Sequence, residues 1–273
     1  MPHCPVFIVS DRSGLTAETL SHTLMSQFPD VRFHQRALPF VDTPQKVQQA
    51  VRAIDEAGRE SGCRPLVFAT FVDESFSEIL SAAEGEIFDL FSPFIGRMER
   101  LLDQQSSHKP GQSHGISDVG RYYRRIDAVN YAMHCDDGLH TQDYNRATLI
   151  LLGASRSGKT PTCLYLALHF GFYAANYPLT EEDFGTGVLP GPLEPHKDRI
   201  FGLTIDPMRL HQIRTERRPG SEYASVARCR QDVVRAEQMF RRNGIPFCDS
   251  TNYSVEELGS TIKHQMGLVS SLY

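Results

Sequence analysis

The sequence lacks the features that identify several classes of protein. Its six cysteines are scattered, and no two of them form a Cys-x-x-C pair. A zinc ribbon or a thioredoxin-type motif is therefore excluded, and free thiols in a reducing compartment are expected. No apolar run is long enough to span a bilayer, and residues 1–10 lack the basic and apolar pattern of an export signal. These absences predict a cytoplasmic protein.

Positive charge is not in excess either. The chain has 28 lysines and arginines against 33 acidic residues, a net charge of -5. General binding to nucleic acid or to an anionic membrane is therefore not expected. Hydrophobic residues make up 40% of the 273 residues, which is enough to bury a core without disulfides or a structural metal.

The first hundred residues alternate between strand-like and helix-like patterns. Strands are predicted at residues 6–10, 32–38 and 66–71, and an amphipathic helix follows each of them. The second helix is expected to begin at Pro44, after the N-cap residue Thr43. Alternating βα units predict a parallel sheet with helices on its faces.

A second βα series follows in the other half of the chain. Residues 148–152 are predicted as a buried strand, residues 162–170 as a packed helix and residues 200–205 as another strand. Ser254 and Glu257 form a capping box before the final helix.

These patterns predict an α/β fold in two domains. Residues 1–145 are interpreted as an N-terminal α/β domain with a parallel sheet, which includes an exposed polar loop near 104–117. Residues 146–273 are interpreted as a P-loop kinase-like α/β domain. The boundary is expected somewhere in residues 104–146.

The most specific motif lies between the predicted strand 148–152 and the helix after it. It fits the phosphate-loop pattern G-x-x-x-x-G-K-[ST] at each fixed position. Glycine lets backbone N–H groups turn toward a phosphate, and the following helix directs its positive end there. Lys159 is expected to place a charge on the terminal phosphate, and Thr160 to offer a hydroxyl to Mg²⁺. The predicted nucleotide-binding residues are Gly153, Ala154, Ser155, Arg156, Ser157, Gly158, Lys159 and Thr160.

Three acidic residues are further candidates for phosphoryl transfer. Asp206 follows the predicted strand 200–205 and either helps to hold Mg²⁺ or caps the next helix. Asp136 and Asp137 follow a predicted helix and are either a general base or Mg²⁺ ligand, or part of a simple helix stop. The chain has no Asn-Lys-x-Asp or Thr-Lys-x-Asp stretch, so a guanine-specific GTPase is not expected.

A second anion-binding position and an arginine cluster are weaker signals. Residues 10–16 follow the first strand and open a helix, which suits either anion contacts or plain helix capping. Residues 206–242 hold nine arginines and no lysine. Arginine binds phosphate oxygens in pairs, although an exposed helix face is the alternative. The predicted readers of a target phosphate are Arg209, Arg214, Arg217 and Arg218.

Several separate segments resemble the bacterial phosphoenolpyruvate synthase regulatory proteins, which are relatives of the pyruvate, phosphate dikinase regulatory proteins. The resemblance runs from about Val6 to the last helix. Two departures from the family pattern are Arg12 and Cys135. The segments that carry the resemblance are SDRSGLTAET, PFVDTPQK, RIDAVNYAMHCDDG, GASRSGKTPTCLYLA, AANYPL and FGLTIDPMRL.

The resemblance implies a bifunctional regulator of phosphoenolpyruvate synthase. Such an enzyme is a serine/threonine kinase that uses ADP, with Mg²⁺, to phosphorylate and inactivate its target protein. It reverses this with inorganic phosphate as co-substrate and releases pyrophosphate. Lys159 and an acid from Asp136, Asp137 or Asp206 are the expected catalytic residues. The alternatives are a P-loop kinase of a small metabolite and a non-catalytic ADP-sensing module, and the chain could also form a homodimer.

Overall fold

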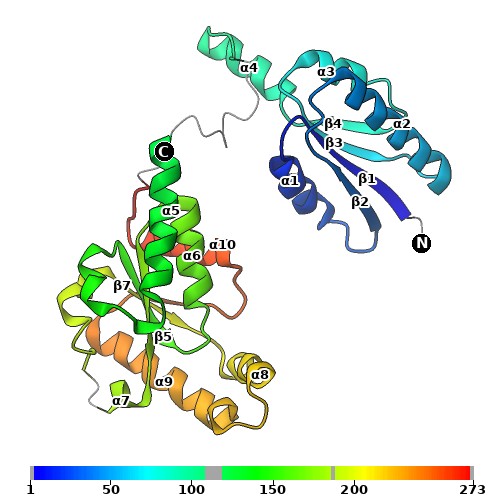
Figure 1. Ribbon diagram of the computed structural model, residues 1–273. Helices are drawn as coiled ribbons and strands as arrows, with labels where there is room; N and C mark the ends of the chain where they lie inside the picture. The colour runs from blue at the N-terminus through cyan, green and yellow to red at the C-terminus, as the bar shows by residue number, and fades with distance from the viewer. Residues whose placement is uncertain (1–2, 108–118, 186–187, 271–273) are drawn as a thin grey trace. The chain divides into compact units, whose positions relative to one another are not determined.

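The first part of the chain forms one parallel sheet with helices on both faces (Figure 1). This computed structural model describes residues 3–107, 119–185 and 188–270. The first unit is Met1–Ser117. Its elements are β1 (His3–Ser10), α1 (Leu15–Met25), β2 (Arg32–Leu38), α2 (Pro44–Ser61), β3 (Leu66–Thr70), α3 (Glu74–Leu80), β4 (Glu86–Asp89) and α4 (Ser92–Leu102).

The core of the first unit lies on both faces of β1. The strand order is β2-β1-β3-β4, and all neighbours pair in parallel. Because successive side chains of a strand point to opposite faces, Val6 and Ile8 pack with α1, whereas Phe7 and Val9 pack with α2 and α3. The predicted parallel sheet is confirmed here.

The second unit, Asp118–Tyr273, repeats this plan with more helices. Its helices and turns before the sheet are α5 (Val119–His134) and the 3₁₀ turns η1 (Asp136–Gly138) and η2 (Thr141–Arg146). The elements that follow are β5 (Leu149–Ala154), α6 (Lys159–Phe170), β6 (Ala174–Leu179), α7 (Glu181–Phe184), the 3₁₀ turn η3 (Glu194–Arg199), β7 (Ile200–Thr204), α8 (Pro207–Arg217), the 3₁₀ turn η4 (Glu222–Ala224), α9 (Val226–Asn243), β8 (Phe247–Asp249) and α10 (Val255–Gln265).

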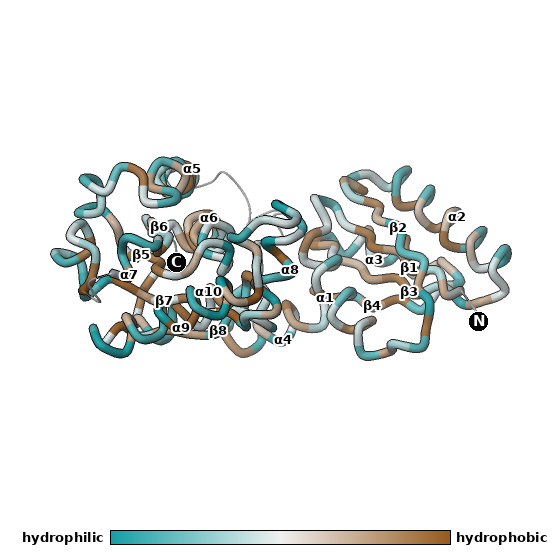
Figure 2. Tube along the Cα trace, turned by 90° about the horizontal axis from the view of Figure 1, so that it is seen from below, coloured by the Kyte–Doolittle hydropathy of each residue, from teal (hydrophilic) through white to brown (hydrophobic). Residues whose placement is uncertain are grey.

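Helices cover both faces of the second sheet. Its strands lie in the order β6-β5-β7-β8, again all parallel. Ile150 and Leu152 pack with α9, whereas Leu149 and Leu151 pack with α5, α6 and α10. Both faces of β5 are therefore buried, which explains its uninterrupted apolar run, and hydrophobic colour marks the central strands in Figure 2. The predicted α/β class is confirmed in both units.

The two units divide inside the predicted range 104–146, but the assignment of residues 118–145 to the first domain is wrong, because α5 belongs to the second unit. The units divide between Ser117 and Asp118. Ala128 and Ala132 of α5 are buried with β5 and α6, and Tyr144 of η2 is buried in the core beneath α9. These apolar contacts attach α5, η1 and η2 to the second sheet. Most of the predicted loop at 104–117 lies outside the described residues.

The two units share one topology. In each, the first strand is central, the second lies on one side of it, and the third and fourth lie on the other. Arg12-Ser13-Gly14 and Arg156-Ser157-Gly158 occupy the same place, between the first strand and the helix that follows it, and both glycines have a positive φ, 77° and 90°. The helix then begins with Leu15 in the first unit and with Lys159 in the second. Leucine therefore follows this glycine in the first unit, and lysine follows it in the second.

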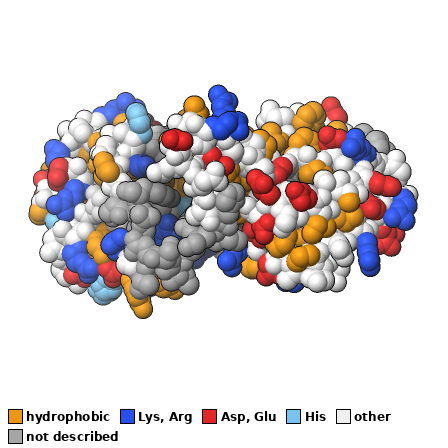
Figure 3. Space-filling model, turned by 90° about the horizontal axis from the view of Figure 1, so that it is seen from above, with side chains coloured by type: hydrophobic (Ala, Val, Ile, Leu, Met, Phe, Trp, Pro, Cys, Tyr) orange, Lys and Arg blue, Asp and Glu red, His pale blue; other side chains and the backbone are white. Residues whose placement is uncertain are grey.

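The surface carries charges of both signs, and the cysteines are unpaired. Acidic and basic side chains both occur on the face that Figure 3 shows. Among the described residues, no helix is both long and apolar enough to cross a membrane. All six cysteines are free, as the sequence predicts, and Cys135, Cys163 and Cys229 are buried.

Gly153→Ala is expected to destabilise the second unit. A Cβ added at Gly153 would overlap the backbone carbonyl oxygen of Leu203, because β5 lies directly beside β7. Backbone atoms of a central strand cannot move aside cheaply, so the free energy of unfolding should fall by about 3 kcal/mol or more. Chemical denaturation measures this change. Gly191→Ala is the control, because nothing lies near its added Cβ, and it should change stability by no more than about 1 kcal/mol.

Candidate active site

The glycine-rich loop, residues 153–160, connects β5 to α6. β5 ends at Ala154, and α6 begins at Lys159 directly after Gly158. The φ angle of 90° at Gly158 is one that glycine adopts without strain. Arg156 also has a positive φ of 77°, which is uncommon for a residue with a side chain. The loop thus makes a tight turn just before the N-terminus of α6, where backbone N–H groups and the helix dipole favour an anion.

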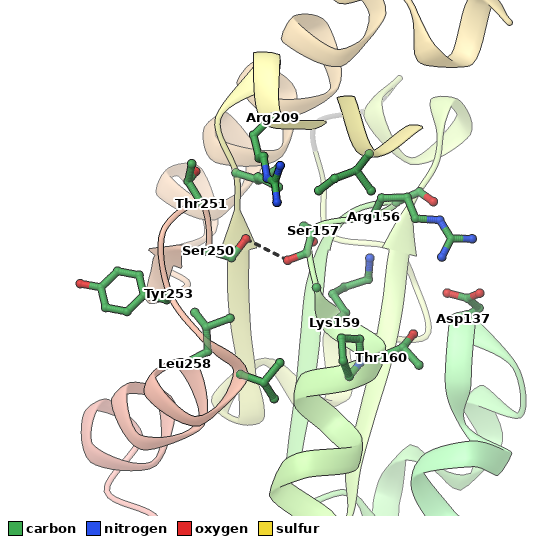
Figure 4. A pocket seen from close by; sticks show the side chains of 16 residues that line it. Asp137, Arg156, Ser157, Lys159, Thr160, Arg209, Ser250, Thr251, Tyr253 and Leu258 are labelled. Atoms are coloured by element: carbon green, nitrogen blue, oxygen red, sulfur yellow. Dashed lines mark hydrogen bonds between the residues drawn. The ribbon is translucent and has the colours of Figure 1, made fainter. Parts of the chain in front are cut away.

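A pocket of about 360 Å³ opens above this loop (Figure 4). Its volume falls in the range of about 300–1,000 Å³ that small-molecule sites occupy. One part of its wall is the loop from Ser155 to Pro161, and Asp137 lies beside Thr160. The wall on the other side includes Tyr253 and Leu258, so the pocket has a polar end and a more apolar end.

Lys159 is the central cation of the polar end. Its side chain is only 4% exposed, and its Nζ donates a hydrogen bond to the carbonyl oxygen of Ala154, 2.9 Å away. Burial lowers the pKa of Lys159 to about 8, although the nearby carboxylates of Asp137 and Asp136 act in the opposite direction. A buried ammonium with so low a pKa gains free energy when an anion enters the pocket. Ser157 supplies a second polar atom here, since its buried Oγ has no hydrogen-bond partner among the described residues.

Asp136 and Thr160 meet beside the loop. Thr160 Oγ1 donates to Asp136 Oδ1 over 2.8 Å, and the buried Asn176 Nδ2 donates to the same carboxylate oxygen. The backbone N–H of Asp137 donates to Asn176 Oδ1 over 3.1 Å. Positive φ angles at Asp137 and Gly138 turn the chain so that this segment faces α6. The hydroxyl of Thr160 and the carboxylate of Asp136 are both hard oxygen ligands, which suits Mg²⁺.

Asp206 takes the capping role rather than a place in the pocket. Its Oδ1 accepts hydrogen bonds from the backbone N–H groups of Met208 and Arg209, each 2.9 Å away, at the start of α8. Its neighbour Ile205 lines the pocket, and Asp206 itself is absent from the described lining. The predicted catalytic role of Asp206 is therefore not supported by its position, because its carboxylate is engaged in helix capping.

The four arginines proposed as phosphate readers occupy three different environments. Arg209 lines the pocket near Thr251. Arg217 and Arg218 are exposed at the end of α8 and are not part of the described lining. Arg214 is 1% exposed and forms an ion pair with Asp232, with a distance of 2.8 Å between Nη1 and Oδ2. The prediction for Arg214 is wrong, because a fully buried and paired guanidinium cannot bind a target protein.

Sequence reasoning missed the residues that complete the pocket. Asn176 orients Asp136 from β6, and Ser250, Thr251 and Tyr253 reach the pocket from the segment after β8. The polar run Asp249–Ser254 was the available signal, since it follows a strand of the same parallel sheet. The strand itself has three residues, too few to show a period.

Comparisons with known proteins identify a family. A model of the Kinase/pyrophosphorylase family matches residues 6–262. A relative from Halorhodospira halophila is 52% identical over 264 residues, and one from Marinobacter nauticus is 48% identical over 262 residues. The alignments cover 96% of this chain in both cases, and 96% and 97% of the relatives. Both relatives carry the name "Putative phosphoenolpyruvate synthase regulatory protein".

The chain belongs to the Kinase/pyrophosphorylase family. The match extends across both units, from β1 to α10, so it covers the glycine-rich loop and the segment that carries Asp136 and Asp137. This membership confirms the resemblance seen in the sequence motifs. It supports a phosphotransferase as the class of enzyme.

The affinity of this pocket for a phosphate-bearing anion is expected to fall as the pH rises above about 8, and ADP serves as the probe. In the free protein the pKa of Lys159 is about 8, and a bound phosphate favours the ammonium, so the pKa is higher in the complex. Between these two pKa values the complex holds one more proton than the free protein. Each pH unit in that range should therefore cost up to about tenfold in affinity. Calorimetric titration with ADP across this range measures the slope.

Lys159→Met is the control for this measurement. It has no ammonium at this position, so it should bind ADP weakly and without the slope. An ADP affinity of the parent protein that stays constant through pH 8 and above would show that Lys159 does not contact the phosphates.

Proposed function

We propose that this chain transfers a phosphoryl group from ADP to a threonine of a phosphoenolpyruvate synthase, and removes it again with inorganic phosphate. The observation that carries the proposal is the convergence of Lys159, Thr160 and Asp136 beside one pocket over the glycine-rich loop. The relatives' names supply the target protein. Threonine as the acceptor and ADP as the donor come from the resemblance of the sequence motifs.

In the forward direction the threonine oxygen attacks the β-phosphorus of ADP. The bond from that phosphorus to the bridging oxygen breaks, and AMP leaves with the electron pair. Lys159 and the loop N–H groups would stabilise the charge that spreads over the transferred group. The hydroxyl proton of the threonine passes to a carboxylate. Asp137 fits this role, because it is exposed and lines the pocket, whereas Asp136 already accepts two hydrogen bonds.

The residues present also fit a magnesium ion. Thr160 and Asp136 would hold it, since both offer oxygen ligands beside the loop. When bound, Mg²⁺ would neutralise part of the phosphate charge. Asn176 keeps the Asp136 carboxylate oriented toward Thr160 through its amide.

The reverse reaction uses the same groups. An oxygen of inorganic phosphate attacks the phosphorus of phosphothreonine, pyrophosphate forms, and the threonine oxygen regains a proton. AMP, the leaving group of the forward reaction, and inorganic phosphate, the acceptor of the reverse reaction, differ by an adenosine, and both transition states spread charge over three equatorial oxygens. A loop preorganised for one transfer is therefore preorganised for the other, and one pocket serves both directions.

Lys159→Ala should abolish both activities together. Removal of one preorganised charge at the transferred group is expected to cost about 100- to 1,000-fold in each direction. The measurement is threonine phosphorylation with ADP and phosphate-dependent dephosphorylation, each with purified synthase. AMP should also compete with inorganic phosphate in the second assay.

Three other outcomes would replace this proposal. Loss of the kinase activity alone in Lys159→Ala would mean two separate sites. Faster transfer from ATP than from ADP, with no need for a protein acceptor, would indicate a kinase of a small metabolite. Binding of ADP by the parent protein without transfer to the synthase would indicate a sensing module.

Arg209 is expected to recognise an additional phosphate on the target. It is the member of the arginine cluster that lines the pocket, so a second phosphate on the target, which we propose is carried by a histidine beside the acceptor threonine, would approach it. Arg209→Ala should slow transfer to the histidine-phosphorylated synthase by about 10- to 100-fold, typical of a lost hydrogen bond between charged groups, and leave ADP affinity unchanged. Arg230→Ala, an exposed arginine of α9, is the matched control. If Arg217→Ala or Arg218→Ala instead removed the preference for the histidine-phosphorylated synthase, the residue that binds the additional phosphate would lie at the end of α8.

A further inference from the structure

Arg214 is a buried cation that the transfer reaction does not use directly. Its guanidinium donates to Asp232 Oδ2 over 2.8 Å and to the carbonyl oxygen of Tyr223 over 3.0 Å. Asp232 is itself nearly buried and also accepts from Arg228 Nε over 2.8 Å. Burying two charges is costly unless they have further hydrogen bonds. The partners of the other N–H groups of Arg214 therefore indicate the role of this buried cation.

Those donors hold the glycine-rich loop. Arg214 Nε and Nη2 lie 3.3 and 3.1 Å from the carbonyl oxygen of Ser155, and both donate to it. The guanidinium lies 4.1 Å from the centre of the Tyr223 ring, and the Tyr223 hydroxyl donates to Ser155 Oγ over 2.9 Å. Arg214 and Tyr223 thus fix both the backbone and the side chain of Ser155.

A held carbonyl also sets the direction of the next N–H group. In a trans peptide the C=O and the N–H of the same plane point in opposite directions. The Ser155 carbonyl points to Arg214, so the N–H of Arg156 points away from Arg214. Two further carbonyls of the loop are fixed by hydrogen bonds. Lys159 Nζ donates to the Ala154 carbonyl, and Ser250 Oγ donates to the Ser157 carbonyl over 3.0 Å.

We infer that Arg214, together with Tyr223, is a positioning residue that keeps the N–H groups of the glycine-rich loop directed at a bound phosphate. Successive N–H groups held in this way form an anion-binding concavity. The inference rests on the proposed function for the identity of the ligand, a nucleoside diphosphate. Arg214 itself does not touch that ligand, because it is buried and absent from the described pocket lining.

The arrangement also ties the loop to α7. Asp232 pairs with Arg228, and Arg228 pairs with Glu181 at the start of α7. Arg235 of α9 donates to the other carboxylate oxygen of Glu181 over 2.7 Å. A continuous series of charged contacts therefore runs from the Ser155 carbonyl to the residue that follows β6 and Thr180.

Arg214→Lys is the first test. A lysine keeps the charge opposite Asp232 but loses the planar fork that reaches the Ser155 carbonyl. We expect ADP to bind about 10- to 100-fold more weakly, the range for hydrogen bonds from a charged donor. Arg199→Lys is the matched control, because Arg199 also donates to two backbone carbonyls, of Asn145 and Ala147, and does not line the described pocket.

The readout separates loop positioning from loss of fold. Unfolding reduces the number of active molecules, which lowers kcat and leaves the KM for ADP unchanged. A displaced loop raises the Kd and the KM for ADP in protein whose circular dichroism is native. With saturating ADP, whose phosphates would protect the amides of Arg156 and Gly158, hydrogen exchange at these amides should also become faster in Arg214→Lys and stay unchanged in Arg199→Lys.

A double-mutant cycle tests the hydroxyl contact. Tyr223→Phe keeps the ring beside Arg214 and removes only the hydrogen bond to Ser155 Oγ, so ADP binding should weaken by about 2- to 10-fold. Ser155→Ala should produce a similar loss, and the double variant should lose no more than either single variant. Fully additive losses would overturn a role for Tyr223 through Ser155.

Two outcomes distinguish this inference from the proposed function. Unchanged ADP affinity together with unchanged exchange in Arg214→Lys would overturn the inference, whatever reaction the protein performs. Weaker ADP binding and faster exchange in that variant support it, even if the parent protein transfers no phosphate to threonine, a result that would overturn the proposed function instead.

Discussion

All strands of the second sheet run in parallel, and the candidate site follows from this constraint. Parallel strands end at the same edge, so the segments after β5, β7 and β8 meet there even though they are far apart in the sequence. Ligands of open α/β sheets bind at this edge, beside the central strand at which the strand order reverses. Here β5 is that strand, with β6 on one side and β7 on the other. The glycine-rich loop follows β5 directly, so it lies at this reversal of the strand order.

Two buried cations lie near this edge, and their chemistry separates their roles. Arg214 is paired with Asp232 and donates to backbone carbonyls, so its charge and hydrogen-bonding capacity are engaged by the protein itself. Lys159 donates to one carbonyl, and burial lowers its pKa. A rigid, always charged fork suits the fixing of a loop, whereas a mobile ammonium suits a ligand that arrives and leaves. The protein thus holds the loop with one cation and offers the other to the substrate.

Much of the fold could be predicted because its signals are local. The apolar runs of β1, β5 and β7 and the caps at Thr43 and Ser254 are visible in the sequence, and the structure confirms them. The short strands β4 and β8 have four and three residues and show no period. Arg214 was predicted to bind a target phosphate because it lies in an arginine-rich segment, and both interpretations of that segment, a phosphate reader or an exposed helix face, require an accessible side chain. Its spacing of four residues from the buried Leu210 was the signal that it faces the core.

The repeated topology indicates why the second unit, and not the first, fits the proposed phosphate chemistry. Both units place a left-handed glycine before the helix that follows their first strand, so the backbone conditions for an anion are alike. The copies differ at the next residue: Lys159 is buried, whereas Leu15 is 56% exposed. Burying a lysine costs desolvation free energy, which the nearby carboxylates and the Ala154 carbonyl return in part and a bound anion would return further. The second unit contains this buried lysine and places Asp136 and Arg214 around the loop. In the first unit the loop is followed by the apolar side chain of Leu15, which could not stabilise a transferred phosphate.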